Sequence, residues 1–325
     1  MSSLGHKHDT TVIICCEKGD LENQSILFVR SLRKFGGDFK KSRVLCFCPR
    51  PHRTPTNHTL KLLEKEEVEI ITKNLNPQYS DYGFGNKPLI CGYAERNFPS
   101  RNYVFFDSDQ LILKEPTILK SLSPTDTFLL PVDKKGVGST GSDETATFWK
   151  NLHNHFNIKQ PRKLKTTVTN TSIWNYWNAG LLPVVGNKEI YSQWQETFEE
   201  MMGNKMFPSG NKTFTDQISF SLAVQQLEIN IDQLPIGYNY PIQDHFNTCE
   251  ENKILNVASA HTLHYHRSFK TPSKANKAIF QLLSEHPQYN WFMDQFQKVH
   301  LYPRPFTYRL KYYFNSYLNT VKNRL

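Results

Sequence analysis

Short apolar runs alternate with helix-like segments along the first third of the chain. A short continuous apolar run is typical of a buried strand, whereas apolar residues three or four positions apart indicate one buried face of a helix. The alternation predicts a parallel or mixed sheet flanked by helices, with ligands at the carboxyl ends of the strands. The pattern predicts strands at 11–16, 42–48, 68–72 and 103–106, and helices at 21–35, 58–67 and 86–96.

The second half of the chain continues the pattern less regularly. We expect strands at 127–132 and 254–259 and helices at 188–203 and 215–228. Two segments, 134–147 and 159–171, have the composition of loops. Loops beside a ligand-binding edge serve either as lids or as plain surface connections, and the composition does not choose between these roles.

The last part of the chain changes character after residue 271. Residues 272–325 contain two short helical patterns, two prolines (Pro303 and Pro305) and a final helical pattern with one apolar face and several lysines and arginines. We therefore predict an α/β domain at 1–271 and a helical extension at 272–325. The apolar face favours packing onto the domain, and the alternative is peripheral contact with a membrane surface.

Composition supports a globular protein with a large core, since 38% of the 325 residues are hydrophobic and 13% aromatic. The N-terminal residues lack the apolar segment of a signal peptide, so we expect a cytoplasmic protein with reduced cysteines. The net charge of +9 favours anionic partners. Lysines and arginines are dispersed and no nucleic-acid-binding motif is present, so we expect no specific nucleic acid partner.

Two carboxylates follow the predicted buried strand at 103–106. Asp107 and Asp109 are two positions apart, so in extended backbone both point to the same side and can reach one hard cation. Alone, such a pair is as consistent with a solvated turn. His264 also follows an apolar segment, and two carboxylates with an imidazole are suitable ligands for Mn²⁺.

Several motifs occur in one order between residues 11 and 272, and together they resemble those of GT-A fold glycosyltransferases, most closely glycosyltransferase family 8, which includes glycogenin and bacterial lipooligosaccharide galactosyltransferases. The motifs are Asp107-Ser108-Asp109, Asn178-Ala179-Gly180, Asp216-Gln217, Leu234-Pro235-Ile236-Gly237-Tyr238-Asn239 and the segment from His264 to Lys270. The resemblance implies a GT-A fold, which is a mixed, mostly parallel sheet flanked by helices.

Roles for individual residues follow from the resemblance. It implies that Mn²⁺ (or Mg²⁺) is bound by Asp107, Asp109 and His264, with Asp109 and His264 holding the ion most directly. It implies that the donor is bound by Lys87, Asp107, Ser108, Asn178, Ala179, Gly180 and Lys270. It implies catalytic roles for Asp216, Gln217 and Asp133.

This chain departs from the family pattern at two places. Arg267 replaces a glycine and Thr271-Pro272 replaces Pro-Trp, which leaves the role of Lys270 open. The segment 17–20 lacks the tyrosine that contacts the base in the family, so the identity of the base is open too.

The resemblance implies a metal-dependent transfer of a hexose from a nucleotide-diphosphate sugar, expected to be a UDP-sugar, to a hydroxyl of a glycan, lipid or protein acceptor, with retention. One alternative is a degenerate, non-catalytic protein that binds nucleotide sugars or glycans. A second alternative, a sugar-phosphate nucleotidylyltransferase, requires a glycine-rich loop after the first strand, and Cys15-Cys-Glu-Lys-Gly19 is not such a loop.

Overall fold

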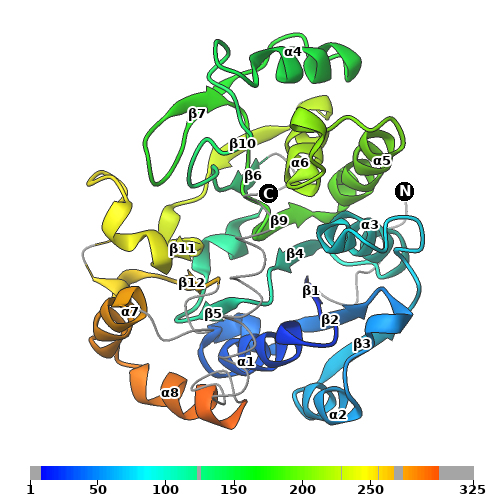
Figure 1. The fold of residues 1–325 in the computed structure, drawn as a ribbon. Helices are drawn as coiled ribbons and strands as arrows, with labels where there is room; N and C mark the ends of the chain where they lie inside the picture. Colours follow the sequence, from blue (N-terminus) through cyan, green and yellow to red (C-terminus); the bar gives the residue numbers. More distant parts are fainter. Residues whose placement is uncertain (1–8, 123–125, 228, 255, 267–273, 300–325) are drawn as a thin grey trace, which may run out of the picture.

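A five-stranded mixed sheet forms the centre of the molecule. The computed structural model describes residues 9–122, 126–227, 229–254, 256–266 and 274–299. The strand order is β3-β2-β1-β4-β9, in which the first four strands are parallel and β9 is antiparallel to β4 (Figure 1). The strands are β1 (Thr10–Cys15), β2 (Arg43–Cys48), β3 (Val68–Thr72), β4 (Asn102–Phe106) and β9 (Leu181–Val185).

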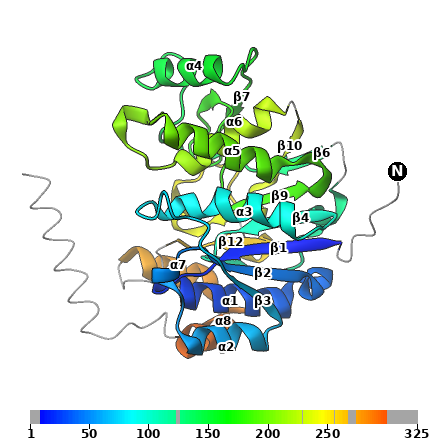
Figure 2. The ribbon, with the colours of Figure 1, turned by 90° about the vertical axis from the view of Figure 1, so that its right-hand side faces the viewer.

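Helices cover both faces of this sheet (Figure 2). Successive residues of β1 belong to different cores: Val12 and Ile14 pack with α1, whereas Ile13 and Cys15 pack with α3 and α5. Burial on both faces explains why the strands read as continuous apolar runs rather than as alternating ones. The helices are α1 (Asp20–Phe35), α2 (Asn57–Lys65), α3 (Asn86–Asn97), α5 (Ile190–Gly203) and α6 (Thr215–Gln226).

Smaller sheets complete the architecture on the side of β4 and β9. β5 (Gln110–Ile112), β12 (Thr262–His264) and β11 (Tyr240–Pro241) form a three-stranded sheet in the order β11-β12-β5. Two further pairs join β6 (Asp126–Leu129) to β10 (Asn230–Gln233) and β7 (Lys163–Lys165) to β8 (Ser172–Trp174). The other α-helices of the described residues are α4 (Ala146–His155), α7 (Lys274–Ser284) and α8 (Tyr289–Lys298).

The predicted mixed, mostly parallel sheet flanked by helices is confirmed, and some element boundaries are wrong. The strand predicted at 254–259 is absent from the described residues of that segment, where Val257–Ser259 form a 3₁₀ turn. Asn256 caps this turn by accepting a hydrogen bond from the Ala258 backbone N–H at 2.8 Å, and the strand β12 follows it. The segment 159–171 contains β7, and α4 begins inside the segment 134–147, so neither is entirely a loop.

The C-terminal part confirms the two short helical patterns as α7 and α8. Phe292 and Phe296 of α8 are buried in the same core as α1, and the rings of Phe35 and Trp291 meet edge to face at 4.8 Å. The final helical pattern, for which packing onto the domain was predicted and membrane contact was the alternative, lies outside the described residues. None of the described helices is long and apolar enough to cross a membrane.

Candidate active site

The turn between β4 and β5 holds the two acids of the Asp-Ser-Asp motif. The Ser108 hydroxyl donates a hydrogen bond to the Cys15 carbonyl at 2.6 Å, which fixes the turn to the end of β1. The Asp107 backbone N–H donates to the Gly180 carbonyl at 2.8 Å, which fixes it to the start of β9. The acids are therefore attached to two strands of the central sheet, and a rigid support of this kind favours precise ligand geometry.

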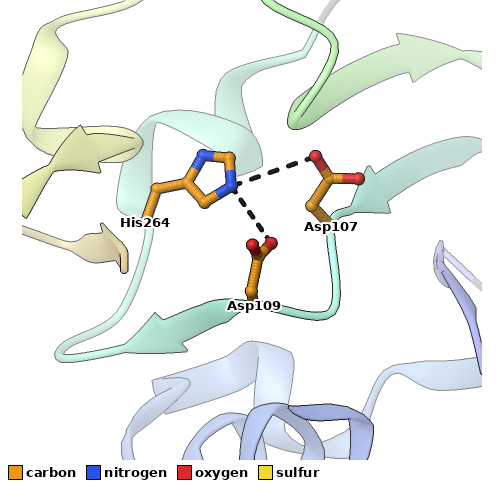
Figure 3. A group of neighbouring side chains, drawn as sticks. All are labelled: Asp107, Asp109 and His264. Atoms are coloured by element: carbon orange, nitrogen blue, oxygen red, sulfur yellow. Dashed lines mark hydrogen bonds and ion pairs between the residues drawn. The ribbon is translucent and has the colours of Figure 1, made fainter. Parts of the chain in front are cut away.

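His264 reaches these acids because β12 is antiparallel to β5. Its Nε2 lies 3.1 Å from an oxygen of Asp109 and 3.9 Å from an oxygen of Asp107 (Figure 3). One ligand atom from each residue lies within 4.8 Å of the others. The His264 side chain is 6% exposed, whereas the two acids are 21% and 23% exposed, so one side of the cluster is open. The donor set fits a divalent ion such as Mn²⁺ with free coordination positions.

Gly180 of the predicted donor-binding segment lies directly behind the histidine. A Cβ atom at this position would be 2.9 Å from His264 Cε1 and 3.0 Å from Asn178 Oδ1. Both distances are shorter than ordinary van der Waals contact, so a glycine is needed for this close approach. The Asn-Ala-Gly motif thus shapes the metal cluster as well as the segment predicted to bind the donor.

Charge pairing dominates the electrostatics of the cluster. Burial alone would lower the pKa of His264, but the neighbouring Asp109 and Asp107 outweigh it and raise the pKa above its usual value. Burial would raise the pKa of Asp109, and the charge and hydrogen bond of His264 instead hold it below its usual range. A metal ion would bind the neutral imidazole, so the raised pKa of His264 makes a proton compete with a metal ion at this cluster.

A second charged group lies beside the cluster. Lys87, in the first turn of α3, places its Nζ 2.8 Å from Asp107 Oδ1 and 3.8 Å from Asp216 Oδ2. Tyr82 donates a hydrogen bond to Asp216 Oδ1 at 2.8 Å. Burial raises the pKa of Asp216, and the positive charge of Lys87 opposes that rise. Lys87 is therefore a partly buried member of the cluster, with its side chain 14% exposed, rather than a freely solvated lysine.

The amides of the motifs hold the backbone around residues 178–180. Asn178 Oδ1 accepts hydrogen bonds from the Gly180 N–H at 2.8 Å and from Asn239 Nδ2 at 3.1 Å. Gln217 Oε1 accepts from the Ala179 N–H at 3.2 Å. Three separate motifs of the sequence therefore meet through direct hydrogen bonds.

Asp133 lies on a different segment from Asp216. Its side chain accepts a hydrogen bond from the Thr167 hydroxyl at 3.1 Å. Burial raises its pKa to about 6, although the positive charge of nearby His264 opposes the rise. Asp133 is thus near enough to influence the metal cluster electrostatically. Lys270, the remaining predicted donor-binding residue, lies outside the described residues.

Sequence reasoning missed two features next to the site. Tyr82 precedes α3 in a segment without periodicity, and its partner Asp216 is distant in sequence, so no local signal pointed to it. The second feature is a buried ion pair between Glu17, after β1, and Arg50, after β2, with Arg50 Nε 2.7 Å from Glu17 Oε1. Arg50 also donates to the Ser80 carbonyl at 2.6 Å, so the pair ties together the ends of two strands and the segment that carries Tyr82.

In sequence, residues 12–228 match the model of the Rhodobacterales glycosyltransferase domain. The match covers more than half of the chain, and the chain belongs to this family of glycosyltransferases. No curated protein matches the chain in sequence.

Among solved structures, the fold is similar to that of the WbbM bifunctional glycosyltransferase in its apo form. The TM-score is 0.52 at 10% identity, over 91% of this chain and 53% of that one. A second similar structure is the glycosyltransferase GlyE of Streptococcus pneumoniae TIGR4, with a TM-score of 0.48 at 11% identity, over 91% of this chain and 64% of that one. This chain thus spans about half to two thirds of the length of these two proteins. The likeness to WbbM supports the GT-A fold.

Proposed function

We propose that this glycosyltransferase is metal-dependent and transfers a hexose from a UDP-sugar to an acceptor hydroxyl with retention of anomeric configuration. The observation that carries the proposal is the cluster of Asp107, Asp109 and His264, which have one ligand atom each within 4.8 Å of the others and lie next to the partly buried Lys87. A nucleotide diphosphate is a good leaving group only when its developing negative charge is stabilised.

Some residues of the site would bind the metal, and Lys87 would stabilise the negative charge of the leaving diphosphate. Asp107, Asp109 and His264 would hold Mn²⁺ or Mg²⁺, which supplies Lewis-acid stabilisation of the diphosphate. Lys87 is held by Asp107 and carries a persistent positive charge, since Asp107 and Asp216 outweigh the effect of burial and raise its pKa. A fixed cation at this position stabilises an anionic leaving group without reorganisation during the reaction.

For a retaining transfer, the contacts of two candidate nucleophiles argue against a covalent intermediate. Gln217 is an amide, a poor nucleophile, and its oxygen already accepts a hydrogen bond from Ala179. Asp216 accepts a hydrogen bond from Tyr82 and faces Lys87. We therefore favour a front-face displacement over a covalent intermediate.

In this displacement the bond between the anomeric carbon and the diphosphate oxygen breaks, and the acceptor oxygen bonds to the same face of the sugar. The acceptor proton passes to the leaving phosphate oxygen. Asn178, Asp216 and Gln217 orient the donor sugar, and Asp133 accepts a hydrogen bond from a sugar hydroxyl.

A donor screen tests the proposal. Each common nucleotide sugar is incubated with the protein and Mn²⁺, nucleotide release is measured, and the anomeric proton of the product is identified by NMR. We expect release from a UDP-sugar that requires Mn²⁺ and is abolished in Asp109→Asn. Asp38→Asn is the matched control, because Asp38 is an exposed carboxylate paired with Lys120 outside the cluster.

Two outcomes would contradict the proposal. Binding of nucleotide sugars without turnover would favour the non-catalytic alternative. Full Mn²⁺-dependent activity in Asp109→Asn would show that the metal is held elsewhere. A near-normal rate in Gln217→Ala would leave the metal assignment intact and exclude a direct catalytic role for Gln217.

A further inference from the structure

Two exposed phenylalanines flank the proposed donor site. Among the described residues, Phe84 and Phe214 are large hydrophobic side chains with unusually high exposure, 49% and 44%. Phe84 lies in the 3₁₀ helix Gly83–Gly85 immediately before α3, and Lys87 Nζ is 5.7 Å from the centre of its ring. Phe214 is the residue before α6, two positions ahead of Asp216. The two rings therefore come from the two segments that deliver Lys87 and Asp216.

These two segments are in contact with each other. Tyr82, next to Gly83, donates its hydroxyl proton to Asp216, and its ring lies 5.9 Å from that of Phe84. Lys212, two residues before Phe214, forms an ion pair with Asp81 and lies 5.9 Å from the Tyr82 ring. The segments that carry Phe84 and Phe214 thus meet at Tyr82 and at the Asp81–Lys212 pair. We call the two phenylalanines and this ion pair the aromatic rim.

The backbone of Phe214 gives independent support for a function. Its φ is +66° and its ψ is 12°, which is the left-handed conformation. Bulky residues rarely adopt this conformation, because it costs free energy that a glycine would avoid. A large, exposed and strained side chain beside reacting groups is more often retained for binding than for stability.

We propose that the aromatic rim binds a sugar ring of the acceptor, so that the acceptor of this enzyme is a saccharide. The inference rests on the proposed function and extends it to the acceptor. The aliphatic C–H face of a pyranose packs on the electron-rich face of an aromatic ring, and its hydroxyl groups need polar partners at the edge. The aromatic rim provides aromatic faces through Phe84 and Phe214 and polar partners through the Asp81–Lys212 pair. Glycines and threonines flank the two phenylalanines in the sequence. An acyl chain would instead need a continuous apolar surface.

The test measures binding and turnover separately. Saturation-transfer NMR is recorded with methyl glycosides of glucose, galactose, mannose and N-acetylglucosamine, and with lactose and maltose, in the presence of UDP and Mn²⁺. Donor hydrolysis without an acceptor is measured alongside. We expect at least one saccharide to bind, and Phe84→Ala and Phe214→Ala to weaken this binding about tenfold through the lost ring contact. Donor hydrolysis should remain near the wild-type rate in both variants.

Further variants separate binding from stability. Phe214→Gly removes the ring and relieves the left-handed strain, so it should lose saccharide binding without lowering Tm. Phe214→Trp keeps an aromatic ring and should retain binding. Phe246→Ala is the matched control, because Phe246 is a comparably exposed phenylalanine (60%) that lies between residues 242 and 247 instead of beside Lys87 or Asp216.

Several results would overturn the inference. These are equal weakening in Phe246→Ala, a parallel loss of donor hydrolysis in the rim variants, or the absence of binding by every saccharide tested. Binding to vesicles of phosphatidylcholine and phosphatidylglycerol that depends on Phe84 and Phe214 would assign the rim to a lipid. Because NMR binding does not require turnover, a protein without transferase activity would refute the proposed function while the saccharide site is still tested.

Discussion

Replacing Gly180 by alanine is the most direct perturbation of the metal cluster. The added Cβ would lie 2.9 Å from His264 Cε1 and 3.2 Å from His264 Nδ1, against an ordinary contact distance of 3.4–4 Å. The backbone of Gly180 is not in the left-handed region, so alanine would strain the site through close contacts of its Cβ and not through its backbone conformation. The imidazole must therefore shift by roughly half an ångström or rotate, although a ligating nitrogen tolerates only about that displacement.

We expect Gly180→Ala to weaken Mn²⁺ binding by about 10- to 100-fold, the range found when groups that orient metal ligands are changed. This corresponds to about 1.4 to 2.8 kcal/mol of binding free energy. Titration calorimetry of the metal-free protein with MnCl₂ measures it without relying on activity. Gly203→Ala is the matched control, because nothing lies within 4 Å of its added Cβ at the end of α5. This control should bind Mn²⁺ normally.

A double-mutant cycle identifies the cause. Asn178 Oδ1 is also only 3.0 Å from the added atom, so displacement of Asn178 is a competing explanation. If the His264 ring transmits the effect, Gly180→Ala should cost little further Mn²⁺ affinity in a His264→Ala background. Wild-type Mn²⁺ affinity in Gly180→Ala would refute the assignment of His264 as a ligand held against Gly180.

Three further predictions concern neighbouring groups. Tyr82→Phe leaves buried Asp216 without its hydroxyl donor and should lower the free energy of unfolding by about 1–3 kcal/mol in urea titrations; an unchanged value would contradict the hydrogen bond. Burial raises the pKa of Asp133 to about 6 in the folded state, so its ionisation lowers the free energy of unfolding as the pH rises from about 4 to 6. In the metal-free protein, Asp133→Asn should therefore raise the free energy of unfolding by up to about 3 kcal/mol at pH 7 and leave it unchanged at pH 3.5. Lys87→Met removes a cation 2.8 Å from Asp107, so Mn²⁺ should bind roughly tenfold more tightly while UDP binds more weakly, and parallel changes of both affinities would refute the division of roles.

The central sheet was predictable because its strands are buried on both faces. The residues Val12–Cys15 of β1 are all apolar, and this pattern can be recognised without knowing which strands lie beside it. The acids at 107 and 109 were predictable for the same reason, since they interrupt an equally clear strand. These features could be predicted because each depends on the burial of one short segment of the chain.

The strand that carries His264 was predicted at the wrong place because it depends on pairing with strands that are distant in sequence. β12 has only three residues, and it exists through pairing with β5 and β11. The segment 254–259 has more apolar residues than β12 and was therefore predicted as a strand. Asn256 in this segment is a residue type that favours turns, and its side chain caps the 3₁₀ turn that forms there. The motif predicted that His264 lies with the two acids, but the position of His264 within the strand could not be predicted.

Partners that are far apart in sequence were beyond prediction. Tyr82 and Asp216 are 134 positions apart, and Glu17 and Arg50 are 33 positions apart. Both contacts depend on where separate segments of the chain meet. A periodicity or a motif describes one segment of the chain, so it cannot predict which residues of two distant segments are in contact.

The charges of the site explain how one cluster can accept both a cation and an anionic donor. Without metal, Asp107 is paired with Lys87 and Asp109 with His264, so each carboxylate already has a positive partner. A divalent ion bound as proposed would take the place of these partners and would bind His264 as the neutral imidazole. Lys87 would then be available to face a diphosphate. The residues that pair the charges of the cluster would thus also supply a cation for the proposed donor.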